Sequence, residues 1–336
     1  MNKVKILPSG LQTWLSEHGW RARSVTPITG GYAATLYRLT LMDEFGEIKS
    51  AVYKKLAEGR ANEAVFYKGA LSATPELVPA IYGWVETADE IGILMEDCGV
   101  AFKSILRTVP QVERMAWQKR AVAWLADQHS HYEDRLPVMM AAGLPATYPV
   151  HSSVEWAQMA FDRLDELADA ARPDIALAPA DVLRVREMAA WFYPHYPAWL
   201  EGRVTLTHGD PHLENLLVAD GRFRLIDWEA ACVALPQRDL AVLLQDVLRA
   251  SERTALETTY FDRLRLHGWD VDSQDFADSY AAFFFDNTLM MLGWEIHKFM
   301  TGHLSSAEIA AIVEVKLRWL DDAFARLHPS LFHHLR

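Results

Sequence analysis

Apolar and polar residues alternate along the first part of the chain in the two-residue period of β-strands. The alternation runs through residues 26–41 around the pair Gly30-Gly31, which predicts two strands joined by a glycine turn. Further strand-like runs lie at 51–54, 81–85 and 92–95. Residues 9–18 and 61–71 have the helical spacing of apolar positions instead. We therefore expect a small antiparallel sheet accompanied by two helices.

From about residue 97 the pattern is mainly that of amphipathic helices. Apolar positions three and four residues apart predict long helices at 111–130, 152–171, 180–193, 236–251, 274–301 and 305–327. Short strand-like runs interrupt the helical part at 204–206, 216–218 and 223–226. The pattern predicts an α+β fold of two lobes, a small antiparallel-sheet lobe of residues 1–96 followed by a larger helical lobe of residues 97–336.

Composition limits the class of protein. The chain has 336 residues, of which 51% are hydrophobic and 12 are Trp, so it is a globular protein with material for a large core. No apolar run approaches the roughly 20 residues that span a bilayer. Because no such run is present, we expect no membrane partner. Cys98 and Cys232 are too few for a disulfide framework or a metal cluster, so we expect a cytoplasmic protein. The formal charge of −12 disfavours nucleic acid as a partner.

The most informative stretch is H-G-D-P-H-L-E-N at residues 208–215, followed by I-D-W-E at residues 226–229. It supplies Asp210, an amide at Asn215 and a second carboxylate at Asp227. Phosphoryl transfer from a nucleotide needs one carboxylate to orient the attacking hydroxyl, and an amide and a further carboxylate to hold Mg²⁺ against the phosphates. The spacing matches H-R-D-x-x-x-x-N followed by D-F-G in protein kinases. We therefore expect a nucleotide-dependent phosphotransferase.

The first lobe contains residues suited to binding the nucleotide. Backbone N–H groups at Gly30 and Gly31 can approach phosphate oxygens closely because glycine has no side chain. Lys54 lies one strand later, where V-A-I-K places a lysine for the α- and β-phosphates, and Glu63 on the next helix can pair with it. The neighbouring Lys55 points to the opposite face of the strand and is the alternative.

Residues 95–99, M-E-D-C-G, join the two predicted lobes. This position suits a hinge whose backbone groups, at Glu96 and Cys98, bind the edge of an adenine. No partner base for a thiol is evident in the sequence, so we expect Cys98 to line the site and not to act as a nucleophile.

These motifs resemble those of the aminoglycoside phosphotransferase and choline kinase family, small-molecule kinases with a protein-kinase-like fold. The resemblance extends over almost the whole chain, at Gly30 to Leu39, Val52 to Lys54, Leu94 to Asp97, His208 to Asn215, Ile226 to Glu229 and Arg238 to Ala241. It implies ATP and Mg²⁺ as cofactors, with Asp210 as the base and Asn215 and Asp227 as metal ligands. His212 would contact the transferred phosphate or make a hydrogen bond that orients the loop.

The resemblance also implies a small-molecule acceptor with a hydroxyl group. Only eleven residues separate Asp227 from Asp239, and no A-P-E segment follows, which leaves no platform for a peptide. Asp286 and Glu295 lie in an aromatic stretch and are candidates for binding the acceptor, or else solvated carboxylates of a packed helix. An aminoglycoside, an amino sugar, a sugar and an amino alcohol all fit.

Two other functions are open at this stage. A regulatory pseudokinase would bind nucleotide without turnover, although Asp210, Asn215 and Asp227 are all present. An atypical protein kinase is opposed by the short segment that follows Asp227. In any of these proteins we expect His208 to support the loop, and Asp239 to cap the helix that it opens and to hold the loop in place.

Overall fold

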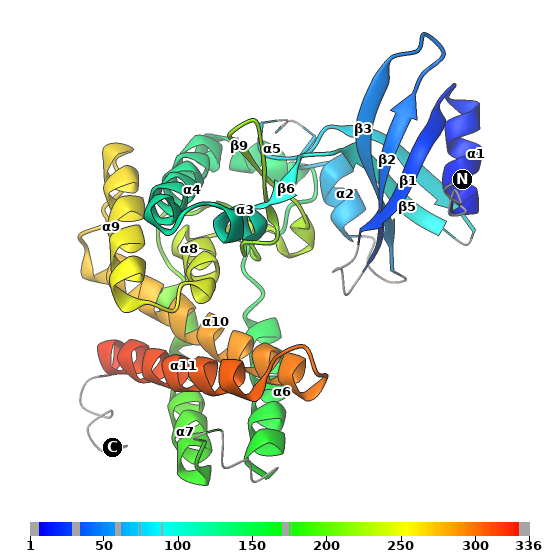
Figure 1. Ribbon diagram of the computed structural model, residues 1–336. Helices are drawn as coiled ribbons and strands as arrows, with labels where there is room; N and C mark the ends of the chain where they lie inside the picture. The colour runs from blue at the N-terminus through cyan, green and yellow to red at the C-terminus, as the bar shows by residue number, and fades with distance from the viewer. Residues whose placement is uncertain are drawn as a thin grey trace. The chain divides into compact units, whose positions relative to one another are not determined.

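The computed structural model describes residues 7–28, 34–57, 62–72, 74, 76–88, 90–169, 175 and 177–328. The chain divides into two compact units. Unit 1 consists of Met1–Thr108, Pro137–Leu144 and Glu214–Ala230, and unit 2 consists of Val109–Leu136, Pro145–Leu213 and Ala231–Arg336. Figure 1 shows a sheet as the main element of unit 1 and helices as the main elements of unit 2.

Unit 1 is built on a five-stranded antiparallel sheet with the strand order β1-β2-β3-β5-β4. The strands are β1 (Arg21–Ile28), β2 (Ala34–Met42), β3 (Ile48–Leu56), β4 (Ile81–Thr87) and β5 (Glu90–Glu96). Helix α1 (Ser9–Glu17) packs Leu11 and Leu15 against the sheet, where Leu39 and Tyr53 belong to the same buried core. The sheet expected from the alternating pattern is confirmed.

Further short elements complete unit 1. They are helix α2 (Asn62–Lys68), strand β6 (Val100–Ala101), helix α3 (Phe102–Thr108), strands β8 (Leu216–Ala219) and β9 (Arg222–Leu225), and a 3₁₀ turn at Trp228–Ala230. Strands β6, β8 and β9 form a second small sheet, in which β8 and β9 are an antiparallel hairpin. Helix α5 (Leu136–Ala141) begins at the last residue of a unit 2 segment and continues into unit 1.

Unit 2 is mostly helical. Its helices are α4 (Gln111–Tyr132), α6 (Val150–Asp169), α7 (Pro179–His195), α8 (Gln237–Leu243), α9 (Ala250–Leu266), α10 (Gln274–Met300) and α11 (Ser306–Leu327), with 3₁₀ turns at Glu133–Arg135, Tyr196–Trp199 and Leu244–Asp246. Strands β7 (Thr205–Thr207) and β10 (Cys232–Ala234) pair antiparallel. Helix α10 packs against α6, α8 and α11, and Figure 1 shows α10 and α11 crossing α6 and α7.

The close approach of α10 to α6 depends on a glycine. A Cβ at Gly293 would lie 2.6 Å from the Cα of Ala160, so a larger residue would push the two helices apart. Within the described residues, no helix has both the length and the hydropathy needed to cross a bilayer.

The single helix expected at residues 236–251 is wrong. Helix α8 ends at Leu243, a 3₁₀ turn follows, and the chain is non-helical at Val247 and extended at Arg249 before α9 begins. Leu244 and Val247 are buried although they lie outside the helix. Because the core-facing side chains continue through the break, the apolar periodicity does not reveal it.

Lys316 of α11 should make stability depend on pH in the alkaline range. It is 2% exposed and donates a hydrogen bond to Gln245 Oε1 at 2.7 Å. Burial lowers its pKa from 10.5 to about 8, against the attraction of Glu295 and Asp246. Between these two pH values the unfolded chain keeps a proton that the folded chain has released, so the contribution of Lys316 to stability rises with pH.

We expect the free energy of unfolding to increase by about 1.5 kcal/mol more in the wild type than in Lys316→Met between pH 8 and about pH 9.5. The comparison removes the titration of other groups, which both proteins share. Urea unfolding at the two pH values measures it. Identical changes in the two proteins would show that Lys316 keeps an ordinary pKa in the folded state.

Candidate functional site

In unit 1 the candidate nucleotide-binding residues centre on Lys54 of β3, whose ammonium is paired with two carboxylates. Its Nζ lies 2.5 Å from Oε2 of Glu63 on α2 and 2.9 Å from Oδ1 of Asp227. Burial would lower the pKa of Lys54, but Glu63 and Asp227 more than compensate and raise it above its ordinary value. Lys54 is therefore a cation throughout the physiological range.

The sequence left Lys54 and Lys55 as alternatives for the partner of Glu63, and the structure pairs Glu63 with Lys54. Glu63 stands in the first turn of α2 and is 2% exposed, and a carboxylate that is so deeply buried needs a cationic partner. Lys54 supplies that partner. Lys55 is the next residue of β3, where it lies opposite Thr35 and Gly92.

The candidate metal ligands Asn215 and Asp227 flank the β8–β9 hairpin at its open end. Leu216 pairs with Leu225, and beyond this pair the N–H of Ile226 donates to the carbonyl oxygen of Asn215 at 3.1 Å. The hairpin thereby brings together two residues that are twelve positions apart in the sequence. Neither would be adjacent to the other in an isolated strand.

Asp227 has a φ of 68°, a backbone conformation uncommon for residues other than glycine. Such conformations persist only where surrounding contacts hold them, and the carboxylate of Asp227 is held by Lys54. An amide and a carboxylate oxygen are suitable ligands for Mg²⁺, which in phosphotransferases takes its remaining ligands from phosphates and water. Among the described residues there is no group of three or more His, Cys, Asp or Glu that could hold a metal ion.

The other nucleotide-binding candidates are Gly30, Gly31, Glu96 and Cys98. Gly30 and Gly31 fall outside the described residues. Glu96 ends β5, where its N–H donates to the carbonyl oxygen of Ala80 at 2.8 Å and its carboxylate accepts from the N–H of Ala80 at 3.1 Å. Cys98 is 3% exposed, and burial, with a smaller contribution from Glu96, raises the pKa of its thiol to about 12. The thiol is neutral at physiological pH and is not a nucleophile.

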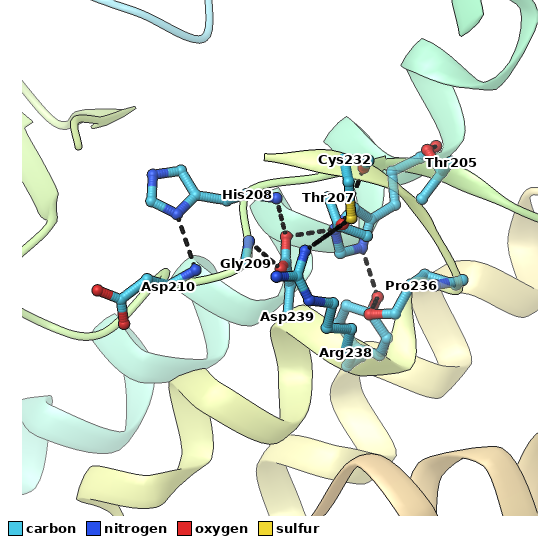
Figure 2. Close-up of polar contacts among 11 residues, drawn as sticks. Thr205, Thr207, His208, Gly209, Asp210, Cys232, Pro236, Arg238 and Asp239 are labelled. Carbon is cyan, nitrogen blue, oxygen red and sulfur yellow. Dashed lines mark hydrogen bonds and ion pairs between the residues drawn. The ribbon is translucent and has the colours of Figure 1, made fainter. Parts of the chain in front are cut away.

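In unit 2 the loop that carries Asp210 follows strand β7 and is held by Asp239 of α8 (Figure 2). Oδ2 of Asp239 accepts a hydrogen bond from the N–H of His208 at 2.7 Å, and Oδ1 accepts one from the N–H of Gly209 at 2.8 Å. The N–H of Asp210 in turn donates to Nδ1 of His208 at 3.1 Å. Gly209 has a φ of 88°, which side chains other than glycine rarely adopt.

The expected support of the loop by His208 and Asp239 is thus present, but the expected capping of the helix by Asp239 is wrong. Helix α8 begins at Gln237, with Pro236 as the N-cap, so Asp239 already lies within the first turn. Its carboxylate binds the loop and not the N–H groups of its own helix. Burial would raise the pKa of Asp239, but a hydrogen bond from His129 and the charges of His129 and Arg238 lower it below its ordinary value.

Arg238 contacts both β7, the strand that leads into the Asp210 loop, and its partner strand β10. Its Nη1 donates to Oγ1 of Thr207 on β7 at 2.9 Å and lies 3.1 Å from Sγ of Cys232 on β10 (Figure 2). Its guanidinium also lies 4.7 Å from the centre of the Tyr148 ring. Removing Arg238 would therefore loosen the pairing of β10 with β7, the strand that precedes Asp210.

Asp210 and His212 have accessible side chains that lie near each other. Nε2 of His212 is 3.6 Å from Oδ2 of Asp210, and the two side chains are 29% and 44% exposed. A carboxylate with this exposure can accept a hydrogen bond from a hydroxyl group of a ligand. Asp210 and His212 belong to unit 2, whereas Asn215 and Asp227 belong to unit 1.

Sequence reasoning missed two residues next to Asp239. His129 of α4 lies with Nε2 3.2 Å from Oδ2 of Asp239 and with Nδ1 2.5 Å from the hydroxyl oxygen of Tyr260 on α9. Both residues are buried. The available signal was a histidine on the apolar face of the predicted helix at 111–130, but nothing in the pattern identified its partners.

Asp286 of α10 is buried, and four hydroxyl groups surround its carboxylate. Oδ2 accepts hydrogen bonds from Tyr148 at 3.0 Å, Ser153 at 2.9 Å and Tyr196 at 3.1 Å, while Oδ1 accepts one from Tyr193 at 2.9 Å. Burial raises the pKa of Asp286 in spite of these four donors. Asp286 is therefore not a solvated carboxylate.

Glu295 lies more than two turns further along α10 and is more accessible. Its side chain is 13% exposed, and Oε1 accepts a hydrogen bond from Nζ of Lys298 at 3.1 Å. The structure thus distinguishes the two candidate carboxylates, since Asp286 is 5% exposed and accepts hydrogen bonds from four hydroxyl groups, whereas the side chain of Glu295 is 13% exposed and pairs with Lys298.

Solved structures of similar fold cover almost the whole chain. Amicoumacin kinase hAmiN, in complex with AMP-PNP, Ca²⁺ and Ami, is 14% identical, with a TM-score of 0.62 over 97% of each chain. A choline/ethanolamine kinase family protein from Mesorhizobium loti is 17% identical, with a TM-score of 0.58 over 98% of this chain and 97% of that chain. The GDP complex of wild-type aminoglycoside 2'-phosphotransferase-IIIa is 12% identical, with a TM-score of 0.56 over 93% and 99%. These similarities establish the protein-kinase-like fold.

Sequence comparison gives a shorter match and a longer one. A segment of 69 residues is 44% identical to Protein StrN of Streptomyces griseus, and it covers 20% of this chain and only about a fifth of that relative, 21%. Residues 78–273 match the phosphotransferase enzyme family. Because this second match extends over more than half of the 336 residues, the chain belongs to the phosphotransferase enzyme family.

Proposed function

We propose that the chain transfers the γ-phosphoryl group of ATP to a hydroxyl group of a small molecule. The observation that carries the proposal is the ammonium of Lys54 held between Glu63 and Asp227. Two carboxylates around one ammonium leave an excess negative charge, which a divalent cation bound at Asp227 would offset. A lysine and a metal site together are what the phosphates of a nucleotide require.

Asp210 is proposed as the base. As an oxygen of the acceptor forms its bond to the γ-phosphorus and the bond to the ADP oxygen breaks, the proton of the acceptor hydroxyl moves to the carboxylate of Asp210. His212, 3.6 Å from Asp210, is placed to contact the phosphoryl group or to orient that carboxylate. The hydrogen bonds from His208 and Gly209 to Asp239 keep the start of the loop in one position.

Asn215 and Asp227 are proposed to hold Mg²⁺, which when bound neutralises charge on the phosphates. We propose residues 1–96 as the nucleotide-binding part and residues 97–336 as the catalytic and acceptor-binding part. The remaining nucleotide contacts are assigned to the backbone at Gly30, Gly31, Glu96 and Cys98.

A cytoplasmic location is part of the proposal. Cys98 and Cys232 are both free and buried, as expected of thiols in a reducing compartment. ATP, the proposed phosphoryl donor, is also available there.

The test is turnover of ATP and Mg²⁺ by the purified protein against a panel of aminoglycosides, hexosamines, choline, homoserine and an unstructured protein substrate. We expect ADP release that depends on one of the small molecules, with the phosphorylated product detected by mass spectrometry. Nucleotide binding without turnover would instead favour a regulatory pseudokinase, and phosphorylation of the protein substrate alone would favour a protein kinase.

The acceptor is proposed to be a polyhydroxylated amine, because Glu295 and Asp286 place negative charge on α10. A desolvated ammonium group needs charged or strongly accepting partners. Glu295 can contact it directly, whereas Asp286 would act through the partly buried hydroxyl groups of Tyr148 and Tyr193.

Glu295→Gln should raise the KM for the acceptor by about tenfold, since a hydrogen bond to a charged group contributes about 1.5–3 kcal/mol. The KM for ATP should change little, and the effect should shrink at high salt. Asp286→Asn should act in the same direction and also lower stability, because an amide N–H₂ would face hydroxyl donors. Glu314→Gln, an exposed carboxylate on α11, is the matched control. Unchanged acceptor KM values in both α10 variants would remove the support for a cationic acceptor.

A further inference from the structure

The carboxylate of Asp239 is shared by three donors that come from two parts of unit 2. Two are the backbone N–H groups of His208 and Gly209 in the loop, and the third is Nε2 of His129 in α4. Oδ2 accepts from both His208 and His129, whereas Oδ1 accepts from Gly209. The imidazole of His129 therefore contacts the same carboxylate oxygen that accepts the hydrogen bond from the N–H of His208.

The hydrogen on this imidazole can be assigned from its surroundings. Asp239 is 1% exposed, and its lowered pKa makes it an acceptor without a proton of its own. A nitrogen that faces such an oxygen at 3.2 Å must carry a hydrogen, so Nε2 of His129 is protonated. On the other side of the ring, Nδ1 lies 2.5 Å from the hydroxyl oxygen of Tyr260, which also lies 3.1 Å from the carbonyl oxygen of Pro236, so the single hydroxyl hydrogen of Tyr260 has these two acceptors within reach.

The backbone near the loop is tied to the same helix. The hydroxyl of Thr205 on β7 donates to the carbonyl oxygen of His129, so α4 and the strand leading to the loop are joined at this residue. His129 thus makes two contacts near the loop. Its carbonyl oxygen accepts from Thr205 on β7, the strand before the loop, and its imidazole contacts the carboxylate of Asp239, which binds the loop.

We propose that His129 is a positioning residue for phosphoryl transfer, which through its Nε2 hydrogen orients Asp239 and thereby the loop that presents Asp210. The expected effect on kcat rests on the proposed function. The hydrogen assigned to Nε2 of His129 rests only on the contact with Asp239. Geometry at a reacting carboxylate matters because a displacement of about 1 Å can cost about 10²-fold in rate.

Nitrogen NMR of the wild-type protein labelled with ¹⁵N-histidine tests the hydrogen directly, whether or not an acceptor is known. The His129 signals are those that vanish in His129→Gln. We expect a protonated Nε2 in slow exchange with solvent between about pH 6 and pH 8, since the site is buried. An Nε2 without hydrogen would overturn the proposal, because Asp239 would then lack its third donor.

Steady-state kinetics tests the consequence for the reaction. His129→Leu should lower kcat by about 10²-fold while the KM for ATP stays within about twofold. His129→Gln, which can still direct an N–H at Asp239, should recover most of the lost kcat. The matched control is His267→Gln, since His267 also pairs with an aspartate of α4, Asp127 at 2.8 Å, but is exposed.

The two variants separate positioning from stability. A folded His129→Leu protein with wild-type kcat would overturn the proposal, as would equal losses of kcat in His129→Leu and His129→Gln. If His129→Leu does not fold, His129→Gln and the nitrogen signals of the wild type decide. A wild-type protein without phosphotransferase activity would count against the proposed function and leave the NMR result as the test of the hydrogen.

Discussion

Asp210→Asn should lower kcat by about 10²–10⁴-fold, the range that a positioned general base contributes. The amide has the shape of the carboxylate but cannot take the proton of the acceptor hydroxyl. Because the loss falls on the transition state, the KM for ATP and the Kd for ATP should change little. Steady-state kinetics with an identified acceptor and calorimetric titration of nucleotide measure the two quantities.

The position of Asp210 makes this variant informative. Its side chain is 44% exposed, so the change leaves no buried charge unpaired, and the N–H of Asp210 keeps its bond to His208. Asp262→Asn, on the surface of α9, is a matched isosteric control with a 62% exposed side chain. Normal turnover by Asp210→Asn would remove this residue from its proposed role.

Asp227→Asn should abolish the dependence of nucleotide affinity on Mg²⁺. The carboxylate is proposed to hold Mg²⁺, and a neutral amide would neither bind this cation as strongly nor offset its charge. Asn is preferred to Ala for this test because Asp227 has a positive φ, which Asn tolerates better than Ala. The Kd values for ATP with and without Mg²⁺ should become equal.

Lys54 provides the internal comparison for this experiment. In the Asn variant the ammonium loses one carboxylate partner and keeps Glu63, so binding of metal-free ATP through Lys54 should persist. Lys54→Met should weaken nucleotide binding whether or not Mg²⁺ is present. Calorimetry of both variants separates the contribution of the lysine from that of the metal, and an unchanged Mg²⁺ dependence in Asp227→Asn would contradict the assignment.

Local pattern was sufficient for most elements of the fold. Alternation around Gly30-Gly31 predicted β1 and β2, and helical spacing predicted α10 and α11 almost to their ends. These elements have one buried face along their whole length, which is what periodicity records. At residues 236–251 the buried face continues through a 3₁₀ turn to Val247, which lies in a short non-helical segment, so periodicity alone predicted one helix where there are two.

Local sequence was also sufficient to identify the candidate residues of the site. Asp210, Asn215 and Asp227 stand at a spacing that few other functions require, and the match to the phosphotransferase enzyme family covers all three. The strand-like runs on either side of this stretch predicted β7, β8 and β9. Motif spacing therefore indicated both the reaction class and the short strands that position its residues.

Tertiary structure decided which side chains meet. The order of strands in the sheet and the placement of α2 put Glu63 against Lys54, and the β8–β9 hairpin put Asn215 beside Ile226. The sequence leaves open that Asp286 is a solvated carboxylate, but in the fold α6, α7, the turn at Tyr196 and the segment just before α6 direct four hydroxyl groups at it. Such contacts join residues far apart in the chain, and a periodic pattern contains no record of them.

The loop that carries Asp210 shows most clearly the difference between what local sequence predicts and what the tertiary structure determines. The sequence alone indicated that Asp239 follows the candidate residues Asp210, Asn215 and Asp227 at the start of an apolar helix, and a cap was the local interpretation of that position. Folding turns its carboxylate away from its own helix toward the backbone of His208 and Gly209, with His129 from a helix about a hundred residues earlier as the third donor. A buried carboxylate must satisfy its oxygens with whatever donors the fold brings near, and only the packing of α4 and α8 determines which donors those are.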